Sequence, residues 1–323
     1  MAEQTLTVGE KPLRAVTTSQ RRRWSRQFNG DRILSLLLLS PSVIAIAIFV
    51  YSFIGYTGFV SLTKWNTFTP DYTFVGLANY VKLFDNERFR IDLGNTFTFT
   101  ILFLISCLVL GFILAVLLDQ RIRGEGIFRS IFLFPLAISF IVTGVSWRWL
   151  LNPGDPASGI TGVNLLLDQV GLGFLKNGWY TDPNIGIKAV VIAATWQMSG
   201  YVMAMFLAGL RGIPEDLREA ARVDGANEFQ IYRHIILPLL QPITLGAIII
   251  LGHISLKIFD LVVSMTGRGV AFSTDVPALF MFDIVFQAQA YAVGAAVATI
   301  LLLSVAVLIV PYLIYNMRTE AER

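Results

Sequence analysis

The sequence has few charged residues and very few of the side chains that bind metals. Only 15% of its 323 residues are charged and 55% are apolar, whereas about a quarter of a typical soluble domain is charged. Two His and one Cys leave little for a metal site, and the single cysteine, Cys107, excludes a disulfide within the chain. The composition therefore predicts a membrane protein with little soluble mass.

The chain also lacks the signatures of an enzyme. It contains no Gly-x-x-x-x-Gly-Lys-Ser/Thr phosphate-binding loop, so the sequence predicts no ATP binding of the P-loop kind. No Ser/His/Asp arrangement, pair of buried carboxylates or metal-spaced cluster stands out. We therefore expect no catalytic residue, no metal and no cofactor bound by this chain. If ATP drives its work, hydrolysis must come from another subunit.

Long apolar runs, in contrast, are abundant. A helix needs about 20 apolar residues to cross the hydrocarbon core of a bilayer. Five uncharged runs reach that length, and a sixth is interrupted only by Arg148, which lies between two tryptophans as in an interfacial belt. Pro135 is expected near a helix start, where it need not break the helix. The sequence thus predicts an all-α polytopic membrane protein with six spans, Ile33–Thr63, Leu93–Leu118, Ser130–Leu151, Ala189–Leu210, Ile235–Leu256 and Ile284–Met317.

The basic residues are distributed unevenly between the segments that connect these spans. With both termini inside, 16 of the 25 Lys and Arg residues lie in inside segments and six in outside segments. Because cytoplasmic loops carry an excess of Lys and Arg, this asymmetry predicts that both termini are cytoplasmic. The chain then consists of a cytoplasmic tail at residues 1–31, a six-helix domain at residues 32–318 and a short tail at residues 319–323. The tail contains the cluster Arg21, Arg22, Arg23 and Arg26, which we interpret as an anchor ahead of the first span rather than a nucleic-acid site.

The cytoplasmic loop at residues 211–238 has the pattern of two short helices joined by a turn. Pro214 suits the first position of a helix, and Gly225 suits the left-handed conformation that ends one. Asn227 followed by Gln230 has the pattern of a capping box, which starts a second helix. A short helix with small and apolar side chains suits docking into a partner's groove. Packing of the loop on its own bundle is the alternative.

The same loop resembles the EAA motif of ABC importer permeases. The resemblance is carried by Glu219-Ala220-Ala221, by Gly225 after a gap of three residues, and by Leu237-Pro238. It implies the type I importer permease fold, in which this loop is the coupling helix that inserts into a cleft of a cytoplasmic ATPase subunit. The ATPase-coupling residues that it implies are Glu219, Ala220, Ala221, Asp224, Gly225, Phe229, Tyr232 and Pro238.

Other segments resemble the carbohydrate subfamily of these permeases, which includes maltose-type and glycerol-phosphate-type subunits. This further resemblance is carried by Phe134-Pro135, by Trp147 with Asn164, and by Phe259-Asp260 with Thr266-Gly267, which is similar to an FD…TGGGP segment. The run Gly267-Arg268-Gly269-Val270 departs from the Gly-Gly-Gly-Pro of that segment. The resemblance implies a subunit of an ATP-driven, binding-protein-dependent sugar importer.

The resemblance also implies a set of partners. A second, homologous permease would complete the translocation path, and a homodimeric cytoplasmic ABC ATPase would bind ATP with Mg²⁺. A periplasmic or lipid-anchored sugar-binding protein would deliver the substrate. The chain itself would contact membrane lipid and no nucleic acid, as a multi-pass protein of the cytoplasmic (inner) membrane of a bacterium or archaeon. Transport would proceed by alternating access.

Polar side chains within the apolar runs are candidates for the substrate path, because hydrocarbon makes them costly. Aromatic faces together with hydrogen-bonding groups are the mixture that recognises sugars, while packing between helices is the alternative for each residue. Lys257 and Asp260 are expected on one helix face, where they would neutralise each other. The candidates are Trp196, Gln197, Tyr201, His253, Lys257, Asp260, Gln287 and Tyr291.

An ion-coupled secondary transporter or a channel is the alternative function. Such proteins usually place carboxylates or broken helices near the middle of the membrane. The predicted spans contain no Asp or Glu at that depth, which favours the importer.

Overall fold

The structure, a computed structural model, describes residues 34–120, 122–154 and 159–321. The chain divides into two compact units, residues 1–56 and 57–323. Within the described ranges the chain is helical apart from its connections, which include an isolated antiparallel bridge between Thr63 and Phe74. The predicted N-terminal tail and its arginine cluster lie outside the described residues.

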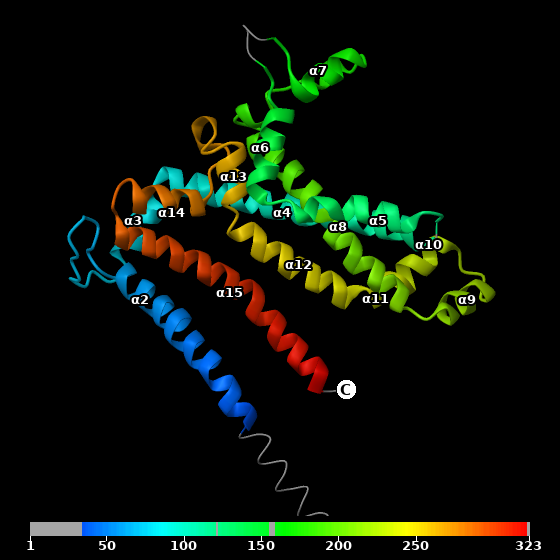
Figure 1. Ribbon diagram of the computed structural model, residues 1–323, viewed down its shortest axis with the longest axis horizontal. Helices are drawn as coiled ribbons and strands as arrows, with labels where there is room; N and C mark the ends of the chain where they lie inside the picture. Colours follow the sequence, from blue (N-terminus) through cyan, green and yellow to red (C-terminus); the bar gives the residue numbers. More distant parts are fainter. Residues whose placement is uncertain (1–33, 121, 155–158, 322–323) are drawn as a thin grey trace, which may run out of the picture. The chain divides into compact units, whose positions relative to one another are not determined.

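Figure 1 labels the helices, which are mostly α-helices with short π and 3-10 segments. The first helix, Leu34–Ser61, contains the π segment η1 (Ala47–Tyr51) and α2 (Ser52–Ser61). The remaining elements are α3 (Ala78–Asp85), α4 (Glu87–Asp119), α5 (Glu125–Leu133), η2 (Phe134–Ala137), α6 (Phe140–Leu150), α7 (Gly162–Gln169), η3 (Gly173–Leu175), η4 (Trp179–Thr181), α8 (Gly186–Gly212), α9 (Glu215–Val223), α10 (Glu228–Ile231), η5 (Tyr232–Ile236), α11 (Leu237–Leu239), α12 (Gln241–Leu256), α13 (Asp260–Met265), η6 (Val270–Phe272), α14 (Pro277–Phe286) and α15 (Tyr291–Ala321).

Four of the described helices are long and apolar enough to cross a membrane, namely Leu34–Ser61, α4, α8 and the Tyr291–Ile314 part of α15. Two further candidates are bent pairs, α5–η2 with α6, and α10–α11 with α12. Counting each bent pair as one span gives six, the number that the sequence predicts. The all-α polytopic fold is thus confirmed, while the shapes of several spans differ from expectation.

The third predicted span, Ser130–Leu151, is not one straight helix, because the chain bends by 100° between η2 and α6. Pro135 lies at the start of η2, where it cannot donate a backbone hydrogen bond, and the hydroxyl of Ser139 caps α6. The carbonyl of Ile138, freed by the break, accepts a hydrogen bond from Gln197 of α8 at 2.7 Å. The expectation that Pro135 leaves this span unbroken is therefore wrong.

The fifth predicted span, Ile235–Leu256, is bent by 63° just before α12. α12 ends at Leu256, Lys257 is its C-cap, and Asp260 begins the separate helix α13. The expectation that Lys257 and Asp260 share one helix face is wrong, since the helix ends between them.

Two of the spans begin at other residues than the sequence predicts. The last span begins at Tyr291 and not at Ile284, because α14 ends at Phe286 and Gln289 adopts a φ of 57°, which no α-helix contains. The second span begins six residues earlier than predicted, at Glu87, where the side chain of Asn86 caps α4. The charged residues that follow Glu87 therefore belong to a membrane helix.

α4 and α8 lie side by side at the centre of the unit formed by residues 57–323. Small residues allow the closest approaches, as is usual between membrane helices. A methyl group on Gly200 of α8 would lie 1.9 Å from the carbonyl oxygen of Phe132 in α5. α8 is thus held tightly against both α4 and the broken third span. In its most apolar stretch of 18 residues, 72% is buried.

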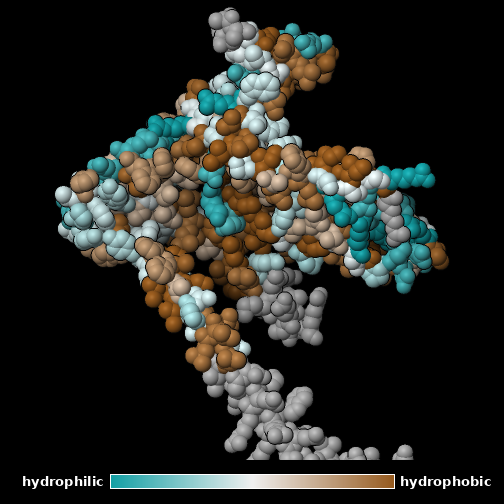
Figure 2. Space-filling model, in the orientation of Figure 1, coloured by the Kyte–Doolittle hydropathy of each residue, from teal (hydrophilic) through white to brown (hydrophobic). Residues whose placement is uncertain are grey.

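Polar side chains gather at the ends of the helices in this unit. Figure 2 shows hydrophilic residues over α9 and α10, with hydrophobic residues along the helices that lead away from them. α4 has 33 residues, so about 50 Å separates its two ends at 1.5 Å per residue. We call the end that carries α9 and α10 the loop end, and the opposite one the Glu87 end.

Candidate functional site

The loop end carries the helix, turn and helix that the sequence predicts. α9 ends in a left-handed turn at Gly225, whose φ is +86°. The N–H of Ala226 donates to the carbonyl of Ala221 at 2.9 Å, and the N–H of Gly225 donates to that of Arg222 at 3.1 Å. These two hydrogen bonds form a Schellman motif, which requires a residue in the left-handed region at this position.

The second short helix, α10, begins with the predicted capping box. The Asn227 side chain accepts from the N–H of Gln230 at 2.9 Å, and the Gln230 side chain accepts from the N–H of Asn227 at 2.8 Å. Pro214 lies one position earlier than expected: it is the N-cap of α9, with an extended ψ of 132°, and the helix begins at Glu215. Capping at both helices fixes the geometry of the turn between them.

α9 turns one narrow side toward the rest of the chain. Of its residues, Arg218 and Ala221 alone are partly buried, and a spacing of three places them on one side of the helix. On the exposed side, Val223 is 88% exposed, and Phe229 in α10 is 70% exposed. Large apolar side chains exposed at the tip of a polar loop indicate a contact surface for a partner.

The predicted coupling residues divide between these two sides. Ala221 and Tyr232 are partly buried, and the Tyr232 ring meets Phe112 of α4 edge-on, with centroids 6.3 Å apart. The exposed members are Glu219, Ala220, Asp224, Gly225, Phe229 and Pro238. Sequence reasoning overlooked Val223 as a contact residue, although an apolar side chain beside the polar residues Arg222 and Asp224 was the available signal.

Arg222 forms one ion pair across the turn to α10 and one within α9. Nε of Arg222 lies 2.9 Å from a Glu228 oxygen, and Nη1 lies 3.7 Å from a Glu215 oxygen. The hydrogen bond to Glu228 raises the pKa of the Arg222 guanidinium, which therefore stays charged. Exposed pairs of this kind contribute little to stability. The backbone turn, more than these charges, determines how the helices are oriented.

Three substrate-path candidates on α8 have different surroundings. Trp196 is partly exposed and meets Trp147 of α6 edge-on, with centroids 5.9 Å apart. Gln197 is buried and is engaged with Ile138 at the break in the third span. Tyr201 is partly buried against the central apolar cluster. Trp196 is therefore the one of the three that is most available to a ligand.

A cavity of about 520 Å³ lies beside Trp196, between α4, α8 and the α5–η2 segment. Its wall is mainly apolar, but Ser106, Thr195 and Ser199 also line it. Ligand pockets of about 300–1,000 Å³ typically combine such an apolar wall with a few polar groups. The cavity adjoins the broken third span, since Phe132 and Pro135 also line it.

The other candidates come from separate places in the fold. His253 is partly buried in α12, whereas Lys257 and Asp260 are exposed beyond the end of that helix. Tyr291 begins α15, and its ring contacts Trp65 with centroids 5.1 Å apart. Gln287 lies after α14, where it takes part in a charged network at the Glu87 end.

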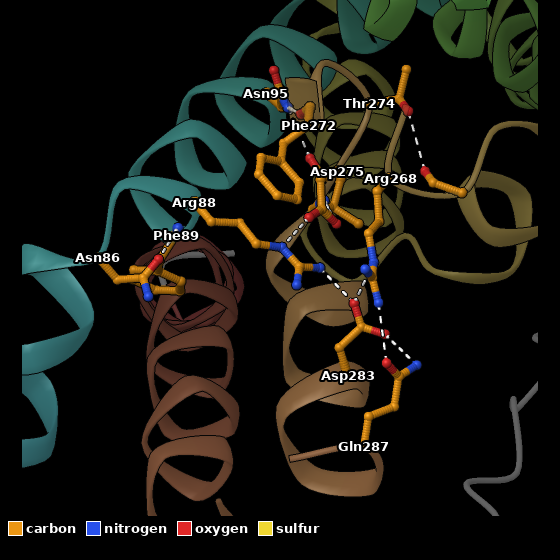
Figure 3. A network of polar contacts seen from close by, with 12 residues as sticks. Asn86, Arg88, Phe89, Asn95, Arg268, Phe272, Thr274, Asp275, Asp283 and Gln287 are labelled. Carbon is orange, nitrogen blue, oxygen red and sulfur yellow. Dashed lines mark hydrogen bonds and ion pairs between the residues drawn. The ribbon is translucent and has the colours of Figure 1, made fainter. Parts of the chain in front are cut away.

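This network joins α4, α14 and the segment between α13 and α14, as Figure 3 shows. Arg88 donates to Asp275 at 2.5 Å and to Asp283 at 2.6 Å. Arg268 donates to Asp283 at 2.9 Å and to Gln287 at 3.2 Å. Burial raises the pKa of Asp275 in spite of Arg88. Burial also acts to raise the pKa of Asp283, but the hydrogen bonds from Arg268 and Arg88 bring it below its ordinary value.

The segment that the network holds has a strained backbone. Ala271 and Phe272 have φ values of 50° and 61°, in the left-handed region that residues with side chains rarely adopt. Asn95 of α4 donates to the carbonyls of Phe272 at 2.8 Å and Asp275 at 3.0 Å. The Arg88 guanidinium lies 5.1 Å from the centre of the Phe272 ring. Side chains of α4 thus hold this segment in a conformation that it would not adopt alone.

These features define a polytopic α-helical membrane protein with two capped short helices at one end. The family model of binding-protein-dependent transport system inner membrane components matches residues 125–319, which is more than half of the chain. The chain belongs to this family.

Comparisons with individual proteins support the same family. A probable ABC transporter permease of Pyrococcus horikoshii is 42% identical over 285 residues, which cover 88% of this chain and 96% of that protein. A xylose/arabinose import permease of Haloferax volcanii is 36% identical over 290 residues, 89% of each chain. A solved bacterial ABC transporter involved in the import of the polysaccharide alginate matches with a TM-score of 0.71 at 23% identity, over 93% of this chain and 99% of that one. The predicted permease fold is confirmed.

Family membership confirms the resemblance to ABC importer permeases and the location in the inner membrane. It disfavours the ion-coupled transporter or channel considered from the sequence, since this family works with a binding protein. Among the described residues, no group of three or more His, Cys, Asp or Glu side chains could hold a metal ion. The position of both termini in the cytoplasm stays a prediction.

Proposed function

We propose that this chain is a permease subunit of an ATP-driven, binding-protein-dependent sugar importer. The family description supports dependence on a binding protein, and the pentose and alginate transporters among its relatives support a sugar as the substrate. The chain forms the translocation path with a second, homologous permease. It is not an enzyme: a cytoplasmic ATPase dimer binds ATP with Mg²⁺ and hydrolyses it.

The observation that carries this proposal is the exposed side of the 211–238 loop, which we call the coupling loop. Val223 and Phe229 offer apolar side chains that a groove on the ATPase can bury. Glu219 is exposed and has no ion-pair partner among the described residues, so its carboxylate is free to pair with a basic residue of the ATPase. The capped turn at Gly225 presents these groups in a fixed arrangement.

The position of the coupling loop in the chain suits the transmission of motion. α9 follows α8 directly, and α12 follows α11 through the 63° bend. A displacement of the loop therefore acts on the fourth and fifth spans together. We place the loop and both termini in the cytoplasm, which the distribution of basic residues supports, because ATP and the ATPase are found there.

The cavity beside Trp196 is our proposed part of the substrate path. It adjoins the break in the third span, and broken helices mark substrate sites in other transporters because they expose backbone groups within the membrane. A tryptophan together with nearby serine and threonine residues suits a sugar, which has both apolar faces and hydroxyl groups. Rocking of α8 against the broken span would change access to this cavity.

Cysteine cross-linking tests the docking of the ATPase. In a Cys107→Ala background, we expect Val223→Cys and Phe229→Cys to form cross-links to the co-expressed ATPase subunit in membranes. Phe174→Cys is the matched control, because Phe174 is also an exposed apolar residue, at 79%, but lies between α7 and α8. Cross-links from position 174 in the absence of any from 223 or 229 would contradict the proposal.

A further inference from the structure

Five charged side chains of alternating sign form a chain at the loop end. Arg218 of α9 donates from Nη1 and Nη2 to one oxygen of Asp119, the last residue of α4, at 3.2 and 3.3 Å. Arg211, in the last turn of α8, lies 4.0 Å from the other Asp119 oxygen and 2.7 Å from an oxygen of Glu125, the first residue of α5. Glu125 also pairs with Arg129. The chain thus connects α9 with the ends of three membrane helices.

The Arg218–Asp119 pair is the most buried part of this chain. Both side chains are 13% exposed, whereas Arg211 is 39% exposed. Charges that are shielded from water interact more strongly and are screened less by salt. The pair lies in the wall of a polar cleft of about 970 Å³, which the start of α9 borders through Pro214, Glu215 and Arg218. Protein atoms therefore fill little of the space between this part of α9 and the span ends.

Arg218 also occupies a distinctive position on α9. It and Ala221 form the partly buried side of the helix, and Ala221 has no side chain long enough to reach a span end. Glu215 and Arg222 of α9 also take part in ion pairs. Both pairs lie within the coupling loop and reach no span. In the described part of the chain, the ion pairs that join α9 to a span are those of Arg218.

We propose that Arg218 is a positioning residue that transmits the motion of the coupling loop to the membrane spans through Asp119. When the ATPase displaces α9, Arg218 displaces the end of α4, and Asp119 shares the displacement with α8 and α5 through Arg211 and Glu125. This inference rests on the proposed function, since it requires an ATPase that moves the loop. A purely structural role for Arg218 would instead affect assembly, hydrolysis and transport together.

The test uses the complete transporter in proteoliposomes, with ATP hydrolysis and sugar uptake measured on the same samples. Arg218→Gln leaves the exposed side of the loop intact, so we expect the ATPase to bind and to be stimulated by the binding protein as in the parent. We expect uptake per ATP hydrolysed to fall by about tenfold, because one charge of a shielded pair is left without its partner. Arg123→Gln is the matched control, with the same change at an exposed residue before α5, and should keep the parent's ratio.

Arg218→Lys keeps a positive charge beside Asp119 and leaves the contact between Asp119 and Arg211 in place, so it should keep the parent's ratio of uptake to hydrolysis. If Arg218→Gln prevents assembly, Arg218→Lys decides: parent-like assembly and ratio support the proposal, and failure of either overturns it. A parent-like ratio in Arg218→Gln also overturns it. An absence of binding-protein-stimulated hydrolysis in the parent itself would overturn the proposed function instead.

Discussion

At the scale of single residues, the coupling loop depends on the backbone conformation of Gly225 and not on close packing around it. A Cβ at this position would meet nothing within 4 Å, so a larger residue is not excluded by lack of space. The φ of +86° is the constraint, because residues with a Cβ are strained in the left-handed region. The requirement for glycine is therefore local, and it concerns the orientation of α9 against α10 rather than the stability of the spans.

We expect Gly225→Val to lower uptake by about tenfold while membrane insertion stays normal. The left-handed conformation costs such a residue about 1–2 kcal/mol, and 1.4 kcal/mol corresponds to a factor of about ten. Gly225→Asn should keep most of the activity, because Asn tolerates this conformation. Initial uptake rates, normalised to the amount of protein in the membrane, provide the measurement.

Gly94→Val is the control for this experiment. Gly94 lies in α4 with a helical φ, and a Cβ there also meets nothing within 4 Å. Its uptake should match the parent's. Parent-like uptake by Gly225→Val would contradict a coupling role for the turn.

The sequence predicted the residues of this turn because their interactions are local. Gly225, Asn227 and Gln230 act on backbone groups no more than a few positions away, so their spacing alone indicates the capping pattern. Arg88 could not be predicted in the same way. Its partners Asp275 and Asp283 lie 187 and 195 positions further along the chain, and no spacing rule connects residues that far apart.

At the scale of elements, hydropathy identified the spans but not their shapes. An apolar run of about 20 residues satisfies the bilayer whether it is straight or bent. The 100° break in the third span depends on Pro135, on the cap at Ser139, and on Gln197 of another helix, which satisfies the freed carbonyl of Ile138. The break could not be inferred from the run itself, since its stabilising partner comes from α8.

The network at the Glu87 end is the clearest case in which side chains hold elements together. Asp92 adds a third carboxyl group beside Asp275, and neither of its oxygens receives a hydrogen bond from the described residues. The two arginines of the network, Arg88 and Arg268, pair with Asp275 and Asp283 and not with Asp92. Arg88 is the one that contacts both Asp275 and Asp283, and so joins α4 to the strained segment and to α14.

We expect Arg88→Met to destabilise the purified protein by about 3–5 kcal/mol, because it leaves the buried Asp275 without its charged partner. Thermal unfolding in detergent measures this change as a lower transition temperature. Arg90→Met removes the same charge from an exposed side chain two positions away, and should change stability by less than about 0.5 kcal/mol. Equal shifts for the two variants would show that the network does not stabilise the fold.

At the scale of the whole molecule, two charged clusters lie at opposite ends of α4. Arg88 lies in the first turn of the helix and Asp119 is its last residue, about 47 Å away at 1.5 Å per residue. α4 and α8 pack along each other between these ends. In the proposed mechanism, a displacement of Asp119 by the coupling loop is carried along α4 to the segment that Arg88 holds. This arrangement suits a subunit that, as proposed, is displaced by the ATPase at one end and controls the access of substrate at the other.

Uptake in proteoliposomes is the decisive measurement. With the second permease, the ATPase, Mg-ATP and the binding protein, we expect the chain to support accumulation of whichever labelled sugar that binding protein retains. Omission of any component should return uptake to background. The binding protein is required because it shifts the transporter toward the state that it binds best. Uptake by this chain alone, driven by an imposed proton or sodium gradient without ATP, would contradict the importer function and support an ion-coupled transporter.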